Sequence, residues 1–418
     1  MTPPRLSPAE HDWLADARLQ KVLSALAAKG GKARIVGGAV RNALLGEPVD
    51  DIDIASTNTP DQVMELCRRA GLRCLPTGVD HGTVTVLAGS ADETRTFEVT
   101  TLRRDVATYG RHADVAFTDD WAADAARRDF TINALYCDGD GEVFDPLGGL
   151  ADIEARRVRF VGEPVARIRE DYLRILRFFR FSARYAAHGH LEPEGFAACI
   201  AEQAGLARLS AERIRQEWMK LAKAPQAAPV IAEMVASGIA ARLLDEPLYP
   251  DRLARLAAIE AKLRRAPDSL LRTVALTGTG GDIAGRLRPR LRLTNQETER
   301  LRRLAIAGPV TPGFRPAERR AILYRNGSAT WRDAVVVSWA EKGAPPDDPD
   351  WTSLYRLAEE WPVPTFPLRG AHLLERGIPP GRELGQLLQE LEDWWIATDF
   401  TLGAEALLAK LADWRPRR

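Results

Sequence analysis

The sequence has 418 residues, too many for one ordinary domain, and a composition normal for a folded protein, with 45% hydrophobic residues. Its 58 basic and 58 acidic residues balance, which argues against binding of long nucleic acids through overall charge but allows a local basic face. No apolar run is long enough to span a membrane, no signal peptide is expected, and four cysteines without CxxC spacing favour a reducing cytoplasm over a disulfide or zinc framework.

Short strand patterns and glycine turns fill the first 160 residues or so. Strand signals cover residues 34–36, 49–55, 81–87 and 95–101. Gly37 and Gly38 predict a tight turn into a short helix over residues 39–45, which Gly46 closes. The last two strand signals form a predicted hairpin, and residues 139–141 another turn. This pattern predicts an α/β segment around a small sheet.

Helical patterns replace the strand signals beyond about residue 160. Apolar residues follow helical spacing over residues 167–185, 211–222 and 296–305. Breaks are expected at Pro225 and Pro229, at residues 277–281 and at residues 345–349. The C-terminal half is therefore predicted to be all helical, in two or more packed units, with aromatic residues such as Trp394 and Trp395 in their cores.

Three acidic residues of the predicted strands suggest a metal site. Alternate strand residues point to one side, so Asp51 and Asp53 project together while Ile52 and Ile54 face the core. Adjacent carboxylates repel each other unless a cation lies between them, and magnesium prefers such oxygen ligands. Glu98 should also face away from the core and supply a third carboxylate. The alternative is that the aspartates are merely solvated residues at a strand edge.

The glycine turn before this strand supports a phosphate site. Glycines let the backbone approach a phosphate closely, and the following helix directs its N-terminus and Arg41 toward it. A glycine pair before a helix is also common without any ligand. The turn and the aspartates together therefore indicate a phosphate and metal site more specifically than either feature does alone.

Ordered motifs identify a family resemblance. The matching blocks are residues 37–46 with 51–53, 127–134, 145–149, 170–177 and 209–214. In this order they resemble class II tRNA nucleotidyltransferases (CCA-adding enzymes) and bacterial poly(A) polymerases of the polymerase β superfamily. Asn42 departs from the pattern, because the family usually has aspartate there. We assign that position no catalytic role from the resemblance.

The resemblance implies an α+β fold and a reaction. A nucleotidyltransferase head with a small mixed sheet would be followed by an all-helical neck, body and tail. The implied boundaries are residues 1–160, 161–225, 226–310 and 311–418. The implied reaction is template-independent addition of C, C and A to the 3′ end of tRNA from CTP and ATP, with two Mg²⁺ ions and release of pyrophosphate.

The resemblance also assigns residues to the nucleotide. Nucleotide-binding residues would be Gly37, Gly38, Arg41, Arg128, Asp129, Asn133, Asp171, Arg174 and Arg177, together with Arg180 further along the same predicted helix. Asp51 and Asp53 would be catalytic, with Glu98 added from the strand pattern. Of the nucleotide-binding residues, Arg128, Asp129 and Asn133 suit the ribose and phosphates, and buried arginine–carboxylate pairing is the alternative for Arg128 and Asp129. Arg177 and Arg180 suit the triphosphate.

Asp171 and Arg174 offer a way to choose the base. They are three apart on a predicted helix, hence on nearly the same face. A carboxylate accepts hydrogen bonds and a guanidinium donates them, which matches the edges of cytosine and adenine and rejects those of uracil and guanine. Each such contact discriminates by ~1–3 kcal/mol. The alternative is an amphipathic helix with a solvated basic face.

The remaining segments concern the RNA. Residues 101–120, which include Gly110, resemble the flexible loop that the family uses to shift from C to A, and its completeness favours full CCA addition. The most basic stretch contains Arg286, Arg288, Arg290 and Arg292, which would contact the backbone of the tRNA acceptor stem or form a solvated face. Thr294 with Glu297 predicts a capping box for the next helix.

Three other functions compete with CCA addition. Poly(A) polymerases share the head motifs, but their basic, aromatic block of the form G-R-R-F is not found, and residues 76–83 resemble the CCA branch. A CC-only or A-only enzyme is a second alternative. An inactive tRNA-binding protein is the third, although binding alone does not need Asp51, Asp53 and Arg41. No DNA or membrane partner is expected.

Overall fold

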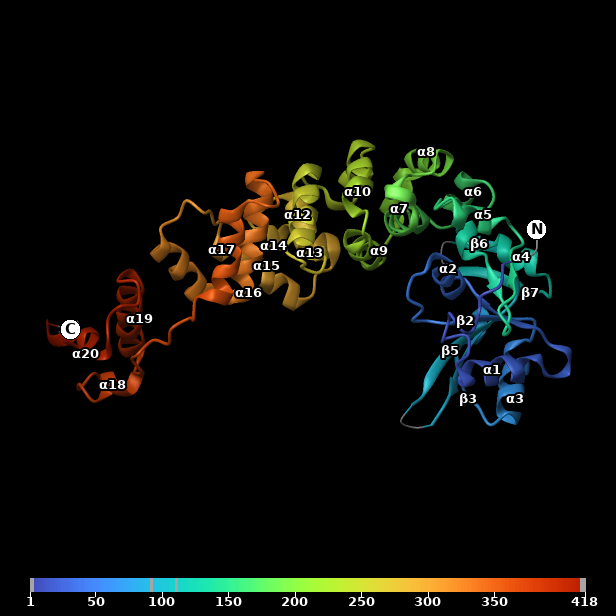
Figure 1. Ribbon diagram of the computed structural model, residues 1–418, viewed down its shortest axis with the longest axis horizontal. Coiled ribbons are helices and arrows are strands. Elements are labelled where there is room, and N and C mark those ends of the chain that lie inside the picture. Colours follow the sequence, from blue (N-terminus) through green and yellow to red (C-terminus); the bar gives the residue numbers. More distant parts are fainter. Residues whose placement is uncertain (1–3, 91–92, 110–111, 414–418) are drawn as a thin grey trace. The chain divides into compact units, whose positions relative to one another are not determined.

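The computed structural model describes residues 4–90, 93–109 and 112–413, with residues 105–109, 112–115 and 412–413 described by their backbone only. It divides into two compact units, residues 1–243 and residues 244–418, which are considered separately (Figure 1). No helix in the described ranges is long and apolar enough to cross a membrane.

The first unit contains a seven-stranded sheet in the order β3-β4-β5-β2-β1-β8-β9. The strands are β1 (Ala33–Val36), β2 (Asp53–Ser56), β3 (Arg73–Gly78), β4 (Thr83–Ala88), β5 (Arg95–Thr101), β8 (Tyr136–Cys137) and β9 (Val143–Phe144). Strands β2 and β5 run parallel and the other neighbours antiparallel. The predicted hairpin is confirmed as β4 and β5, and the sheet is mixed, as expected.

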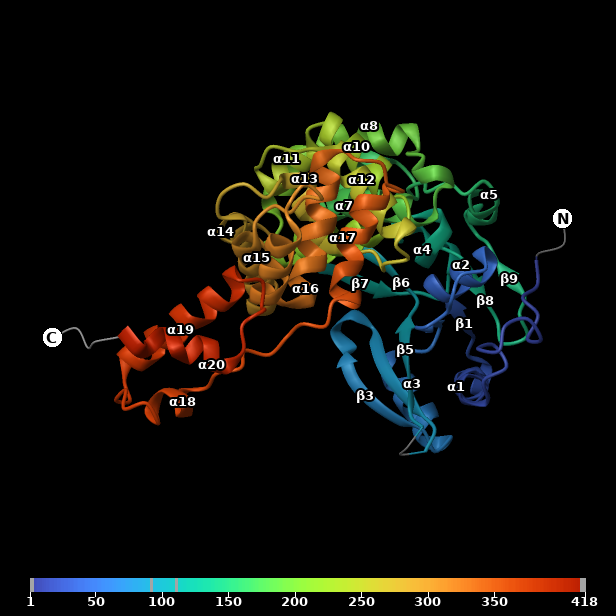
Figure 2. The ribbon, with the colours of Figure 1, turned by 60° about the vertical axis from the view of Figure 1, so that its left-hand side comes forward.

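Helices α1 (Ala17–Ala27) and α3 (Pro60–Arg69) pack on this sheet (Figure 2). In β5, Phe97 and Val99 are fully buried and Glu98 between them is accessible to solvent, so the period-two alternation of the sequence sets which face is buried. In β2, Asp53 is accessible to solvent, but Ile54, Ala55 and Ser56 after it are all buried.

The predicted turn and short helix after β1 are confirmed. Helix α2 (Gly38–Leu45) follows Gly37 directly and ends at Gly46, whose left-handed φ of 70° suits a glycine C-cap. Val36, the last residue of β1, pairs with Asp53, the first residue of β2. The turn therefore begins at the end of the strands where β2 starts.

The segment that resembles the family's specificity loop contains regular structure. Strands β6 (Arg103–Tyr109) and β7 (His112–Phe117) pair antiparallel as a separate two-stranded sheet, and α4 (Trp121–Ala126) follows. Gly110, part of that prediction, lies outside the described residues.

Helices complete the first unit. They are α5 (Gly149–Glu154), α6 (Pro164–Glu170), α7 (Leu173–Tyr185), α8 (Pro193–Glu202), α9 (Ala211–Lys223), α10 (Ala227–Ala236) and α11 (Ile239–Leu244), which reaches the boundary. The helix predicted over residues 211–222 is confirmed as α9. The single helix predicted over residues 167–185 is wrong, because the chain leaves the helical conformation at Asp171, where φ is −151°.

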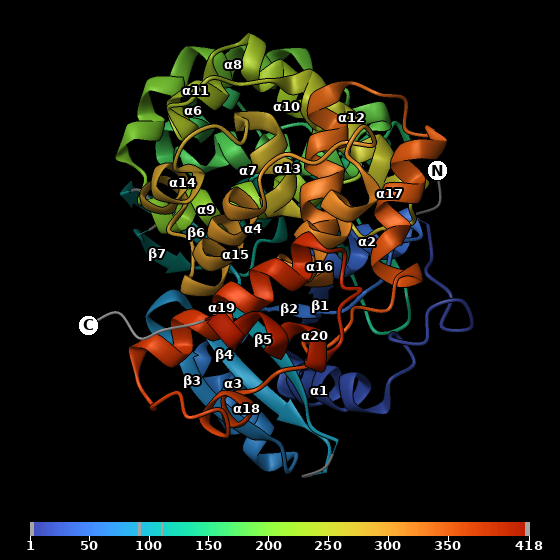
Figure 3. The same cartoon turned by 90° about the vertical axis from the view of Figure 1, so that its left-hand side faces the viewer.

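The described part of the second unit is all helical, as predicted. Its larger group comprises α12 (Pro250–Lys262), α13 (Ser269–Thr277), α14 (Ile283–Leu291), α15 (Asn295–Ala307), α16 (Pro316–Lys342) and α17 (Pro349–Glu360). Helix α16 packs against α12, α13, α15 and α17 (Figure 3). Thr294 and Glu297 form the predicted capping box of α15.

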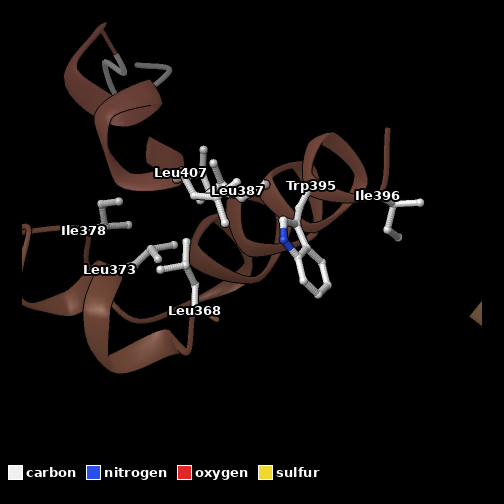
Figure 4. Packing of buried hydrophobic residues seen from close by; sticks show 8 residues of the cluster. Leu368, Leu373, Ile378, Leu387, Trp395, Ile396 and Leu407 are labelled. Atoms are coloured by element: carbon white, nitrogen blue, oxygen red, sulfur yellow. The ribbon is translucent and has the colours of Figure 1, made fainter. Parts of the chain in front are cut away.

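The last helices of the second unit share a separate core. They are α18 (Gly370–Leu374), α19 (Arg382–Ala397) and α20 (Ala404–Ala409). Leu373, Leu387, Trp395 and Leu407 are buried together (Figure 4). The prediction that Trp395 belongs to a core is therefore confirmed, and Trp394 packs against the same cluster.

Candidate active site

Strand register pairs two of the three predicted carboxylates. Asp53 begins β2 and lies opposite Glu98 of the parallel strand β5 and opposite Val36 of β1. Neighbouring strands are about 4.8 Å apart, and directly paired residues point to the same face of the sheet. Asp51 precedes β2 by two residues and is exposed. We call Asp51, Asp53 and Glu98 the carboxylate edge.

Like charges crowd the carboxylate edge. Partial burial and then Glu98 raise the pKa of Asp53, with a smaller contribution in the same direction from Asp51. Arg128 opposes this shift. In residues 4–90, 93–109 and 112–413, no three His, Cys, Asp or Glu side chains converge closely enough to enclose a metal ion. The donor set nevertheless fits magnesium, which often takes only one or two protein carboxylates and completes its shell with water and substrate phosphates.

The glycine turn lies next to the carboxylate edge. Gly37 has a φ of 70° and a ψ of −113°, a conformation that side chains with a Cβ rarely adopt. A Cβ at Gly37 would lie 3.6 Å from Nη1 of Arg128, so the backbone and a guanidinium converge here. The N-terminus of α2 also begins at this turn, which favours a phosphate ligand.

Arg41 is buried beside the turn among neutral acceptors. It donates to Oδ1 of Asn133 and Oδ1 of Asn42, and at 2.8 Å to the Tyr185 hydroxyl. Its guanidinium also lies 4.3 Å from the centre of the Tyr185 ring. Burial lowers the pKa of Arg41. The surroundings thus leave a buried cation without a carboxylate partner in the described part of the chain.

Arg128 makes structural contacts as well as facing the turn. Its Nη2 pairs with Asp124 at 3.1 Å, and its guanidinium lies 5.4 Å from the centre of the Tyr136 ring. Asp124 also accepts from the Tyr136 hydroxyl at 2.7 Å and pairs with Arg127. The alternative of buried arginine–carboxylate pairing therefore describes part of what Arg128 does.

Asp129, Arg177, Glu217 and Arg180 form a continuous chain of ion pairs, which we call the charged network. Asp129 pairs with Arg177 at 2.6 Å and accepts from Asn133 at 2.9 Å. Glu217 pairs with Arg180 and lies 3.8 Å from Arg177. Burial alone would raise the pKa of Asp129, but Arg177 and Asn133 outweigh it and hold that pKa below its usual value.

Asp171 and Arg174 lie at a helix boundary instead of along one helix, which corrects the prediction. The Asp171 carboxylate caps the start of α7 by accepting from the backbone N of Leu173 at 3.1 Å. This local bond competes with helix continuation. The Asp171 carboxylate also pairs with Arg213 at 2.6 Å, whereas Arg174 donates from Nη1 to Glu170 and to the Arg167 carbonyl.

The four predicted RNA-binding arginines belong to α14 and its C-terminus in the second unit. Arg286 pairs with Glu246 at 3.0 Å, and Arg290 pairs with Asp245. Arg288 is exposed and donates to Asn295 at 2.9 Å. Arg292 is exposed and ends the helix in a left-handed conformation.

Several side chains in these contacts were not predicted as site residues, among them Tyr185, Asp124, Glu217 and Arg213. Arg213 lies inside a recognised block, so the sequence carried a signal for it. Tyr185, Asp124 and Glu217 meet the site only through tertiary packing, and no local pattern identifies them.

Two family models and relatives of nearly full length match this chain. Residues 33–159 match the family model described as Poly A polymerase head domain, and residues 190–249 match that described as probable RNA and SrmB-binding site of polymerase A. The mouse protein named CCA tRNA nucleotidyltransferase 1, mitochondrial, is 33% identical over 97% of this chain and 92% of its own length. The CCA-adding enzyme of Levilactobacillus brevis is 29% identical over 94% and 96%.

A solved structure extends the comparison to the fold. The CCA-adding enzyme of Bacillus stearothermophilus, in complex with CTP, is 27% identical and superposes with a TM-score of 0.69 over 91% of this chain and 93% of its own. The strand register, the glycine turn and these matches along nearly the whole length lead to one assignment: the chain belongs to the family of CCA-adding tRNA nucleotidyltransferases.

Proposed function

We propose that this protein adds C, C and A to the 3′ end of tRNA from CTP and ATP without a template. The observation that carries the proposal is the pairing of Asp53 with Glu98 beside the Gly37 turn, in a chain of this family. The tRNA 3′-hydroxyl loses its proton to solvent, and its oxygen forms a bond to the α-phosphorus of the nucleotide. The bond from that phosphorus to the bridging oxygen of the β-phosphate breaks, which releases pyrophosphate.

We infer that the carboxylate edge uses divalent cations, two Mg²⁺ ions in our proposal. Asp51 and Asp53 would hold them, with Glu98 as the third carboxylate. Bound there, magnesium supplies a lower pKa for the attacking 3′-hydroxyl and charge neutralisation for the triphosphate. The raised pKa of Asp53 supports this part, because a cation would favour the ionised carboxylate against the burial and the repulsion by Glu98 that raise this pKa.

The nucleotide would lie between the glycine turn and the charged network. Gly37, Gly38 and Arg41 suit the phosphates, and Arg177 and Arg180 suit the end of the triphosphate. Arg128, Asp129 and Asn133 would orient the ribose. Asn133 supports this role, because it joins Arg41 to Asp129 through its two amide atoms.

Asp171 and Arg174 would select the base as acceptor and donor. Within the described residues, the hydrogen bonds of the Arg174 side chain use only Nη1, which leaves Nε and Nη2 as donors for a base. Asp171 is held by Arg213, so its carboxylate has a defined orientation before a nucleotide arrives. Cytosine and adenine can donate to Asp171 and accept from Arg174. Uracil and guanine would place a carbonyl oxygen, which is an acceptor, against the Asp171 carboxylate, which is also an acceptor.

The remaining assignments concern the RNA and the location. Arg286, Arg288, Arg290 and Arg292 would contact tRNA phosphates. Arg288 is the best supported of them, because it is exposed and donates to the neutral Asn295, whereas Arg286 and Arg290 pair with acidic residues. We retain residues 1–160, 161–225, 226–310 and 311–418 as the proposed head, neck, body and tail. Four free cysteines support our proposal of a reducing compartment, the cytoplasm.

The test is to extend tRNA that lacks its 3′ CCA and to sequence the products. We expect CTP alone to give two C residues, CTP with ATP to give CCA and then stop, and a chelator to prevent addition until Mg²⁺ is restored. Long A tails would instead indicate a poly(A) polymerase, and a product that ends at CC or starts only from CC would indicate a partial enzyme. Tight tRNA binding without extension would leave a binding protein.

A further inference from the structure

Asn42 links two parts of the candidate site through one amide group. Its Oδ1 accepts hydrogen bonds from Nε of Arg41 at 3.1 Å and from Nη2 at 2.8 Å, and from the Tyr185 hydroxyl at 3.3 Å. Its Nδ2 donates to the Pro48 carbonyl at 2.8 Å. Pro48 lies in the short segment between α2 and β2 that leads to Asp51. The amide therefore joins Arg41 to the connection that carries a catalytic carboxylate.

The electrostatic setting of Arg41 gives this contact its importance. Arg41 is only 7% exposed, and its three acceptors, on Asn42, Asn133 and Tyr185, are neutral oxygens. Over the ranges that the structure describes, Arg41 makes no ion pair within the protein. A buried cation held by neutral dipoles keeps its charge available for an incoming anion, at the expense of its own desolvation.

We propose that Asn42 is a positioning residue with two effects on nucleotide addition. Its neutral oxygen orients Arg41 without cancelling the charge that binds the triphosphate, and its N–H group holds the Pro48 segment and thereby Asp51. The inference rests on the proposed function only in taking a nucleoside triphosphate as the anion. It concerns the position at which this chain departs from the aspartate of the family it resembles.

Aspartate at this position would keep the shape but reverse both effects. A carboxylate accepts the same two bonds from Arg41, now as a charge-assisted pair that competes with a triphosphate. It has no N–H group, so it places an oxygen against the Pro48 carbonyl and loses that bond. Alanine also loses the bond to Pro48, and it loses the oxygen that orients Arg41, but it adds no charge. Because aspartate keeps an acceptor for Arg41, weaker anion binding in the aspartate variant than in the alanine variant reports the added charge.

The test compares Asn42→Asp with Asn42→Ala. Relative to Asn42→Ala, Asn42→Asp should weaken the binding of inorganic tripolyphosphate and raise the KM for both CTP and ATP about three- to tenfold. Both variants should lower kcat to a similar extent, because both release Pro48. The matched control is Gln62→Glu, the same amide-to-carboxylate change at an exposed cap of α3, where the carboxylate can still accept from the backbone N of Thr59. It should leave all these constants unchanged.

Two results would overturn the inference. Equal tripolyphosphate affinity and equal KM in the two variants would show that Asn42 does not preserve the charge of Arg41. An unchanged kcat in Asn42→Ala would show that the bond to Pro48 does not position Asp51. Unfolding midpoints identify a misfolded variant, and Asn42→Ser then replaces Asn42→Ala. If the unmodified protein extends no tRNA, the proposed function fails, while the tripolyphosphate comparison still tests the charge effect by calorimetry.

Discussion

The carboxylate edge and the charged network belong to the same unit but balance their charges in opposite ways. At the carboxylate edge Asp53 lies opposite Glu98 and follows Asp51 by two residues, and burial and these like charges raise the pKa of Asp53. In the charged network each carboxylate has an arginine partner, and the pKa of Asp129 falls. The uncompensated carboxylates of the edge support the proposed cation site, whereas arginine partners neutralise the carboxylates of the network and hold their side chains in place.

The largest effect on activity in this comparison is expected from the edge. Glu98→Gln keeps the size of the side chain but removes one anionic oxygen ligand, so addition of CTP should slow about a hundredfold. Single-turnover extension of tRNA lacking CCA measures this rate. Asp50→Asn removes an exposed carboxylate directly before Asp51 and should leave the rate unchanged. Similar losses in both variants would mean that net charge, and not ligand position, controls the reaction.

Breaking the charged network should lower the stability of the folded protein. Glu217→Ala leaves Arg177 and Arg180 without this partner, and breaking such a largely buried pair costs about 3 kcal/mol of unfolding free energy. Urea denaturation followed by tryptophan fluorescence measures the change. Glu65→Ala, which removes an exposed partner of Arg68 and Arg69, should leave the transition midpoint in place. An unaffected midpoint in Glu217→Ala would contradict a structural role for the network.

The contact between Arg213 and Asp171 tests whether paired charges also determine specificity. Arg213→Ala frees the Asp171 carboxylate, so incorporation of UTP relative to CTP should rise about tenfold. Competition of the two nucleotides for one tRNA end measures the ratio. Arg169→Ala removes an exposed partner of Glu202 and serves as the control. A ratio that stays constant while the overall rate falls would assign Arg213 to folding alone.

The smallest effect is a pH dependence of stability from Asp129. Because its pKa is lowered in the folded protein, its ionised form contributes stability above the usual aspartate pKa, and that contribution is lost as pH falls toward the folded value. The unmodified protein should therefore exceed Asp129→Asn in thermal stability by a constant margin at pH 5 to 7, and the margin should shrink below about pH 4. A margin that grows on acidification would reverse the assigned sign.

Much of the fold follows from local sequence patterns. Alternation predicted β4 and β5 as a hairpin, and glycine at residues 37 and 46 bounded α2, because both signals depend on near neighbours. The parallel pairing of β2 with β5 joins segments far apart in the chain, so alternation predicted the outward direction of Glu98 but not its register with Asp53.

In the candidate site, too, local patterns did not predict contacts between residues far apart in the chain. Apolar spacing continues from residue 167 to residue 185, and it concealed the break that the Asp171 side chain makes by capping α7. Arg41 was identified from the glycine turn, but its partner Tyr185 lies 144 residues away and was not. Long-range partners of charged residues depend on tertiary packing, which no periodicity encodes.

The most direct test of the contrast is to measure tRNA binding and nucleotide addition together in Asp53→Ala. If the carboxylate edge serves chemistry and other residues bind RNA, addition should be abolished while tRNA affinity stays within about threefold, because no phosphate contact is removed. Retained addition, or loss of tRNA binding or folding together with addition, would contradict the assignment of Asp53 to the reaction.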